Sequence, residues 1–257
     1  MAVRERLAHP ASMVRADARS ERTHPNAPID TGKGNSMLHD TTTFATGTAI
    51  NPPAFDVIDP LALDITPIIH PRGGVHPDAS RTFWSATANA HYIIRRNGED
   101  MFGPTPDFAA KLVACPDLVA HGRRGPIGCE IDGLVGSALW RKADEAAATD
   151  RPTAPVGFHA VGWLPTNVRR DVWSEIVLEW LDRAIVSNGM VADWAIHAYA
   201  DDRGGWVKKP HMHAVLTGRF WRGSRIGQPQ PAWLQSVKQR AVVQDHWDRL
   251  TRAYSKI

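Results

Sequence analysis

The chain has 257 residues, which is enough for one domain with a sizeable hydrophobic core and an additional segment. A hydrophobic fraction of 43% is typical of a globular protein, and a formal net charge of +3 permits nucleic-acid binding without requiring it. Two cysteines, Cys115 and Cys129, exclude a disulfide framework and a cysteine-type zinc site. No apolar run approaches the ~18 residues of a membrane span, and the N-terminus lacks a secretory signal, so the sequence predicts a cytoplasmic protein.

Residues 1–58 are rich in Ala, Thr, Pro, Asn, Asp and Arg and have no sustained apolar period. Such a segment buries too little apolar surface to fold, so we expect a flexible or disordered leader. A solvated leader and an arm that binds DNA or a partner are both open interpretations. The folded domain is expected over residues 59–257.

Order is expected to begin with a strand over residues 61–70. A helix should follow, capped by Asp78 or Ser80 and continuing to about Arg96, because apolar residues recur there at helical spacing. Tyr92 lies near the end of this helix.

Residues 98–135 are poorly patterned. We expect a helix over 106–114, a short strand over 129–131 and loops elsewhere. A helix over 135–148 and a strand over 158–164 complete this half of the chain.

Thr166 or Asn167 can cap a clear amphipathic helix that continues to about Ser187 and is ended by Asn-Gly. A hairpin follows, and then a flexible Gly/Gln/Pro linker leads to a last helix over 231–254. Together these elements predict an α+β domain, a mainly antiparallel sheet of about five strands with packed helices.

The hairpin consists of strands around residues 195–197 and 209–217, joined by a polar, Gly-rich turn at 201–205. His211 and His213 are two residues apart and therefore share one face, whereas Met212 and Val215 are expected to point toward a core.

The returning strand can bring His197 beside that pair, which predicts a facial three-histidine metal site. The other interpretation is that two surface histidines merely share a strand face. By donor chemistry a neutral imidazole trio suits Mn²⁺, Zn²⁺, Co²⁺ or Ni²⁺ better than Mg²⁺.

Segments 190–197 and 210–219 resemble the signature of the MobA/MobL family of conjugative relaxases, which are DNA endonucleases of the His-hydrophobe-His (HUH) class. The resemblance extends over residues 60–254 and is strongest over 158–219. Segment 85–92 is similar to the family's Ser/Ala-rich first helix, which carries the nucleophilic tyrosine, and segment 138–145 resembles its Leu-Trp segment.

The resemblance implies that His197, His211 and His213 hold a catalytic divalent metal, with Mn²⁺ or Mg²⁺ as the family's usual ions. It implies that Tyr92 is the nucleophile and that Asp144 stands where the family usually has glutamate. The implied function is metal-dependent, strand-specific nicking at a plasmid or mobile-element transfer origin with a 5′-phosphotyrosyl intermediate. Single-stranded or supercoiled origin DNA and accessory proteins of the relaxosome are the implied partners.

Several further residues are candidates for supporting roles. Carboxylates that could orient the histidines are Asp144, Asp193, Asp201 and Asp202. Single-stranded DNA needs cations for its phosphates and aromatic rings for its bases. The candidates are Arg95, Arg96, Lys208, Lys209 and Arg219 for phosphates, and Trp206, Phe220 and Trp221 for bases.

Two other functions remain open. A degenerate relative could bind DNA as a regulator without nicking it, and the Asp at position 144 favours that alternative. A simple metal hydrolase acting on small phosphoesters would lack a protein–DNA adduct. Only Tyr92, Tyr199 and Tyr254 could form such an adduct through a tyrosine. We expect Tyr92, because a side chain from a separate helix can approach a metal-bound phosphate in line.

Overall fold

The computed structural model of the protein describes residues 62–71, 84–129, 136–150, 154–222, 225–229 and 233–256. All of them belong to one compact unit, Ala54–Ile257. The predicted leader, residues 1–58, lies outside the described residues, so its boundary with the domain stays a prediction.

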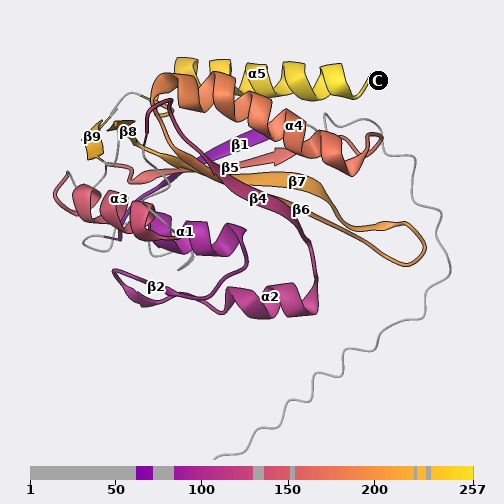
Figure 1. The fold of residues 1–257 in the computed structure, drawn as a ribbon, viewed down its shortest axis with the longest axis horizontal. Helices are drawn as coiled ribbons and strands as arrows, with labels where there is room; N and C mark the ends of the chain where they lie inside the picture. The colour runs from indigo at the N-terminus through magenta and orange to yellow at the C-terminus, as the bar shows by residue number, and fades with distance from the viewer. Residues whose placement is uncertain are drawn as a thin grey trace, which may run out of the picture. The chain divides into compact units, whose positions relative to one another are not determined.

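A five-stranded sheet forms the centre of the domain (Figure 1). Every neighbouring pair of strands is antiparallel. This architecture confirms the predicted α+β class with an antiparallel sheet of about five strands. In spatial order the strands are β1 (Leu63–Ile68), β5 (Gly157–Trp163), β7 (Trp206–Thr217), β6 (Ala192–Ala200) and β4 (Leu118–Arg124).

Helices pack against both faces of this sheet (Figure 1). One face carries α4 (Arg170–Trp180) and α5 (Val237–Tyr254). The opposite face carries α1 (Ala86–Ile93) and α3 (Ala138–Ala148), with α2 (Phe108–Ala114) next to the end of α1. The central strands are therefore buried on both sides.

The alternation of side chains along β7 divides the core in two. Met212, Ala214 and Leu216 pack under α4 and α5. Val215 packs with α1 and α3, on the same face as the histidines. The expectation that Val215 shares a face with Met212 is wrong, because strand residues an odd number apart point to opposite faces.

The first helix is shorter than the sequence predicts. Ser85 caps α1, its hydroxyl oxygen accepting a hydrogen bond from the Ala88 amide at 3.0 Å. The expected caps Asp78 and Ser80 lie outside the described residues. The helix ends at Ile93 rather than near Arg96, because Arg95 adopts a left-handed backbone with φ of 55°.

Other parts are more ordered than expected. β4 occupies a segment predicted as loop, since its polar, half-exposed residues show no apolar period and the strand forms by pairing with β6. A second hairpin, β8 (Arg219–Arg222) with β9 (Arg225–Pro229), occupies most of the predicted linker. A third, two-residue pairing joins β2 (Glu99–Asp100) and β3 (Gly103–Pro104).

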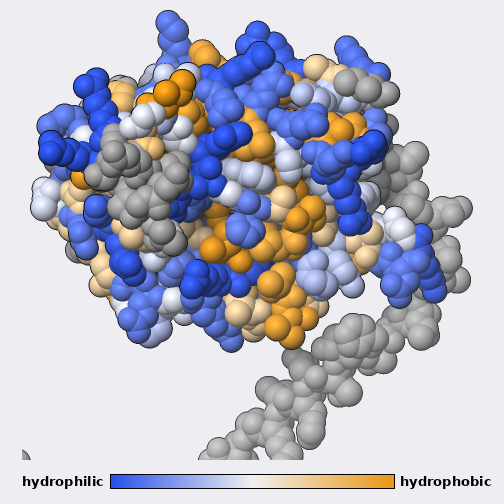
Figure 2. Space-filling view, in the orientation of Figure 1, coloured by the Kyte–Doolittle hydropathy of each residue, from blue (hydrophilic) through white to orange (hydrophobic). Residues whose placement is uncertain are grey.

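The fourth helix also ends differently. α4 passes into a π-helical stretch, Leu181–Ile185, and a 3₁₀ turn, Val186–Asn188, before the left-handed Gly189. No helix in the described ranges is long and apolar enough to cross a membrane. Figure 2 shows hydrophilic residues over most of the visible side, with smaller hydrophobic areas between them.

Gly162 allows α5 to approach β5 closely, and its replacement by alanine should destabilise the fold. An added Cβ would lie 2.5 Å from the buried ring of Trp247 and 3.1 Å from Leu63. Overpacking of this kind costs about 1–3 kcal/mol. Chemical denaturation of Gly162→Ala should show that loss. The matched control Gly205→Ala should stay within about 1 kcal/mol of wild type, because its Cβ meets only the side-chain end of Asp201.

Candidate metal centre

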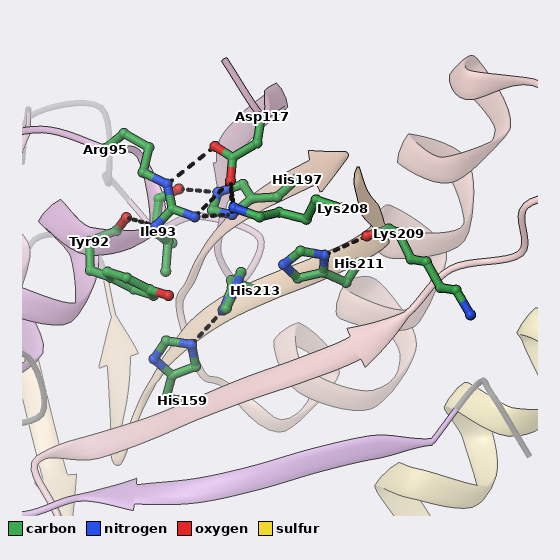
Figure 3. A network of polar contacts seen from close by, with 10 residues as sticks. All are labelled: Tyr92, Ile93, Arg95, Asp117, His159, His197, Lys208, Lys209, His211 and His213. Atoms are coloured by element: carbon green, nitrogen blue, oxygen red, sulfur yellow. Dashed lines mark hydrogen bonds and ion pairs between the residues drawn. The ribbon is translucent and has the colours of Figure 1, made fainter. Parts of the chain in front are cut away.

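Three histidines meet on the α1 face of the sheet (Figure 3). His197 of β6 lies opposite His211 of β7 in the strand register, and His213 follows on the same face. Ring centroids are 5.5 Å apart for His197 and His211, 4.9 Å for His197 and His213, and 5.0 Å for His211 and His213. One ring nitrogen from each histidine lies within 4.8 Å of the other two. All three side chains are buried.

Hydrogen bonds leave His211 with its Nε2 lone pair toward the site. Its Nδ1 lies 2.7 Å from the carbonyl oxygen of Lys209. A carbonyl can only accept a hydrogen bond, so Nδ1 carries the proton and Nε2 is unprotonated in the neutral ring.

A relay of three side chains fixes the tautomer of His213. The Asn89 side-chain amide donates to the Ser85 carbonyl at 2.8 Å, so its Oδ1 must be the atom that accepts from His159 Nδ1 at 2.6 Å. His159 Nε2 then accepts from His213 Nδ1 at 2.8 Å. His213 is therefore left with a lone pair on Nε2, as a metal ligand needs.

His197 is different, because both of its ring nitrogens have partners. Nε2 donates to the Ile93 carbonyl at 2.7 Å, and Nδ1 accepts from Arg95 Nη2 at 2.8 Å. The Arg95 guanidinium is itself bound to Asp117, at 3.0 Å from Nη2 and 3.3 Å from Nε, and the Lys208 ammonium contacts the same carboxylate. His197 can offer its Nδ1 lone pair to a metal only when Arg95 withdraws.

Burial keeps these imidazoles neutral. Loss of hydration lowers the pKa of His159 to about 3 and that of His197 to about 4, and it lowers the pKa values of His211 and His213 as well. Neutral imidazole is the form that binds a metal. Two converging Nε2 lone pairs and a third nitrogen behind a displaceable guanidinium fit a divalent ion with nitrogen ligands.

Tyr92 lies beside this group. Its ring is perpendicular to that of His213, with centroids 5.5 Å apart, and it is half-buried. Two cations lie over the ring, the Arg95 guanidinium carbon at 4.7 Å and the Lys111 ammonium at 4.9 Å from the centroid. In Figure 3 the hydroxyl points toward the side of the histidines.

The other two tyrosines lie elsewhere. β6 continues through Tyr199 and is therefore longer than the strand predicted around residues 195–197, but the strand register shifts on both sides of Tyr199. The Tyr254 hydroxyl donates to Glu179 at 3.1 Å on the opposite side of the sheet.

Asp144 anchors the start of α1 and makes no described contact with the three histidines. Its carboxylate accepts from the Ala86 and Thr87 amides at 2.9 and 3.0 Å, from the Thr87 hydroxyl at 2.6 Å and from His70 Nε2 at 3.1 Å. A carboxylate at a helix N-terminus accepts hydrogen bonds from the free amides and interacts favourably with the positive end of the helix dipole. The structure thus gives Asp144 a positioning role for the helix that carries Tyr92.

The proposed DNA-contact residues are in varied environments. Arg95 is buried in the ion pair with Asp117, which takes it off the surface track that the sequence suggests. Lys208 also contacts Asp117, and Arg219 contacts Asp150. Arg96 and Lys209 are exposed. Their DNA contacts stay predictions.

The proposed stacking residues are less accessible than expected. Trp221 is buried, whereas Trp206 and Phe220 are half-buried against the core under α4. None of them offers a fully exposed ring.

The residues that orient the histidines were not predicted from the sequence. Asp117, His159 and Asn89 fill these roles, whereas the expected Asp193 binds Arg123 and the indole of Trp140. The expected Asp201 closes the β6–β7 turn by accepting from the Arg203 amide. No motif marks the three missed positions, because their partners come from distant segments.

Comparison with known proteins gives one family and a related fold. The model of the MobA/MobL family matches residues 109–250, which include the three histidines and Asp144 but not Tyr92. A solved structure described as "Molecular Basis of Vancomycin Resistance Transfer in Staphylococcus aureus" shares the fold with a TM-score of 0.56. It is 15% identical, and the match covers 76% of this chain and 92% of that one. No curated protein matches the chain.

The buried histidines predict a loss of stability in mild acid. Below about pH 6.5 the unfolded chain takes up protons on His159 and His197, whereas in the folded protein burial lowers the pKa of His159 to about 3 and that of His197 to about 4. The free energy of unfolding should therefore fall from pH 6.5 to 4, by about 1.4 kcal/mol per pH unit for each such histidine. Denaturant titrations at several pH values, with a chelator present, measure this slope.

A pair of variants tests whether protonation of buried histidines causes this loss of stability. His159→Phe should reduce the slope by about one histidine's share, because the residue can no longer take up a proton in the unfolded chain. Val242→Ala, at an exposed position on α5, should leave the slope unchanged, because it removes no titratable group. An unchanged slope in His159→Phe would contradict this explanation.

Proposed function

The chain belongs to the MobA/MobL family, and we propose that it is a metal-dependent relaxase that nicks one DNA strand at a transfer origin and stays attached through a 5′-phosphotyrosyl bond. The observation that carries the proposal is the joint position of Tyr92 and the three histidines, since the tyrosine and the histidines come from separate elements and meet on one face of the sheet. The structural likeness to a protein described in terms of resistance transfer supports the same role.

His197, His211 and His213 would hold the divalent metal. When bound, such an ion can polarise a non-bridging oxygen of the scissile phosphate and stabilise the charge of the transition state. The donor set suits Mn²⁺, Zn²⁺, Co²⁺ or Ni²⁺, and Mn²⁺ or Mg²⁺ follow from the family.

The protein's own groups then perform the transfer. The Tyr92 hydroxyl oxygen attacks the phosphorus and loses its proton, a tyrosyl oxygen–phosphorus bond forms, and the bond from phosphorus to the 3′ oxygen breaks. The 3′ oxygen leaves with a proton as a free hydroxyl. Lys111, which lies over the Tyr92 ring, supplies positive charge near the reacting phosphate. The new ester is close in energy to the old one, so the strand can later be rejoined without ATP.

One observation supports the alternative of a DNA-binding regulator that does not nick. Arg95 occupies the lone pair of His197 in a buried network, so metal binding requires this network to open. If it stays closed, the protein retains a DNA-binding surface without the metal-dependent chemistry.

Metal binding is the first test. Wild-type protein should bind about one Mn²⁺ per chain, measured by calorimetry and by electron paramagnetic resonance. His211→Ala should weaken binding by at least ~10-fold, because it removes a ligand rather than a supporting hydrogen bond. Arg95→Met should bind Mn²⁺ more tightly than wild type, because the competitor for His197 Nδ1 and its positive charge are gone.

The exposed His121→Gln is the matched histidine control and should bind as wild type. Unchanged metal content in a His211→Ala, His213→Ala double variant would exclude the three-histidine centre. Weaker binding in Arg95→Met would show that Arg95 supports His197 instead of competing for it.

The covalent adduct is the second test. Incubation with Mn²⁺ and single-stranded origin DNA should give a protein–DNA band on a denaturing gel. Tyr92→Phe should abolish this band while keeping the metal content, because only the nucleophilic oxygen is removed. Tyr199→Phe is the matched control and should retain it. An adduct peptide identified by mass spectrometry at Tyr199 or Tyr254 would refute the assignment, and nicking without any adduct would indicate a hydrolase.

A further inference from the structure

The chain has ten tryptophans, and the structure describes all of them. Nine are buried or half-buried, whereas the side chain of Trp163 is 41% exposed. A single exposed apolar residue is common on protein surfaces and by itself carries no functional meaning. The position of Trp163, next to the histidine centre, is what distinguishes it.

Trp163 is the last residue of β5 and lies directly opposite His211 in the register of β5 and β7. Opposite residues in an antiparallel pair project to the same face, so the indole shares the face of the three histidines. The two rings are 5.3 Å apart between centroids, with an angle of 51° between their planes. The indole therefore borders the histidine centre directly.

The surface beside Trp163 is open. Val161 lies opposite His213 and is half-buried, and its partner on the neighbouring β1, Asp64, is exposed. Among the described helices, α1 lies over the other end of the same face, where His159 and Val215 are buried (Figure 1).

The strand behind Trp163 is closely packed. Its neighbour Gly162 faces the opposite side of the sheet, against the buried ring of Trp247. The strand therefore presents the indole from a well-packed backbone, which limits the entropy lost when a ligand stacks on it.

We propose that Trp163 is a stacking platform for a nucleobase of single-stranded DNA, next to the phosphate that the histidine centre and Tyr92 would engage. This inference rests on the proposed function and names the surface that holds the substrate. An indole stacks on any base, so the platform would hold the strand in place without reading its sequence. A base in a duplex is already stacked on its neighbours, so the platform selects single-stranded DNA.

Charged residues on either side of Trp163 favour one path for the DNA backbone. Lys209 is exposed on β7, two residues before His211, and its side chain points away from the histidines (Figure 3). Asp64 is exposed on β1, on the far side of β5. The phosphates should therefore follow the Lys209 side of Trp163, because a carboxylate repels them and an ammonium attracts them.

The test is binding of a fluorescein-labelled oligothymidine, measured by anisotropy with EDTA present so that no chemistry occurs. Trp163→Ala should weaken binding by about 5- to 150-fold, the range for loss of one stacked base. Trp163→Phe should retain most of the affinity, because it keeps an aromatic face. Trp163→Leu keeps apolar bulk without that face and should bind as weakly as Trp163→Ala.

Val242→Ala is the matched control, since Val242 is 54% exposed on α5 at the opposite face of the sheet, and its affinity should equal that of wild type. Equal affinity of wild type, Trp163→Ala and Trp163→Leu would overturn the platform and leave the relaxase proposal intact. Absence of any affinity of the wild type for single-stranded DNA would overturn both. Loss of affinity in Trp163→Phe as large as in Trp163→Leu would also refute stacking.

Discussion

At the centre of the sheet, β6 and β7 pair so that His197 lies opposite His211, and every other feature of the site depends on this register. A slip by one residue would turn the histidines to the opposite face. The same slip would take Met212 out of the core under α4 and α5 and Val215 out of the core under α1 and α3. Because both faces of these strands are buried, core packing fixes the register and so holds the three imidazoles together. The imidazoles are buried there and lose their hydration.

Burial makes an unpaired charge costly at these positions. Neutral imidazoles carry no charge, and each has its hydrogen-bond partners. Arg95 brings a permanent charge into the same interior, where it needs the carboxylate of Asp117 as a partner. Its left-handed backbone, uncommon for a residue with a side chain, aims the guanidinium at His197. The site thus contains its own cation, and this cation and a metal would compete for one nitrogen.

The helix that carries Tyr92 has only eight residues and needs tertiary support, because short isolated helices are not stable in water. Asp144 and Ser85 bind the free amides at its start. At its other end the Ile93 carbonyl accepts from His197. The helix is therefore fixed at one end by a carboxylate on α3 and at the other by a histidine of the sheet. Residues far apart in the chain thus determine where the Tyr92 hydroxyl lies.

The sequence by itself determined the elements whose pattern is local. Alternation predicted the hairpin and the shared face of His211 and His213, helical periodicity predicted the long helices, and the motif around the histidines identified the family. Tertiary structure alone decided what depends on pairing between distant segments. β4 forms only because it pairs with β6, and His159 hydrogen-bonds His213 only because β5 lies beside β7. The exposure of Trp163 was also decided by tertiary structure. A tryptophan in an apolar strand is expected to be buried, and only the arrangement of the neighbouring elements leaves this one at the surface.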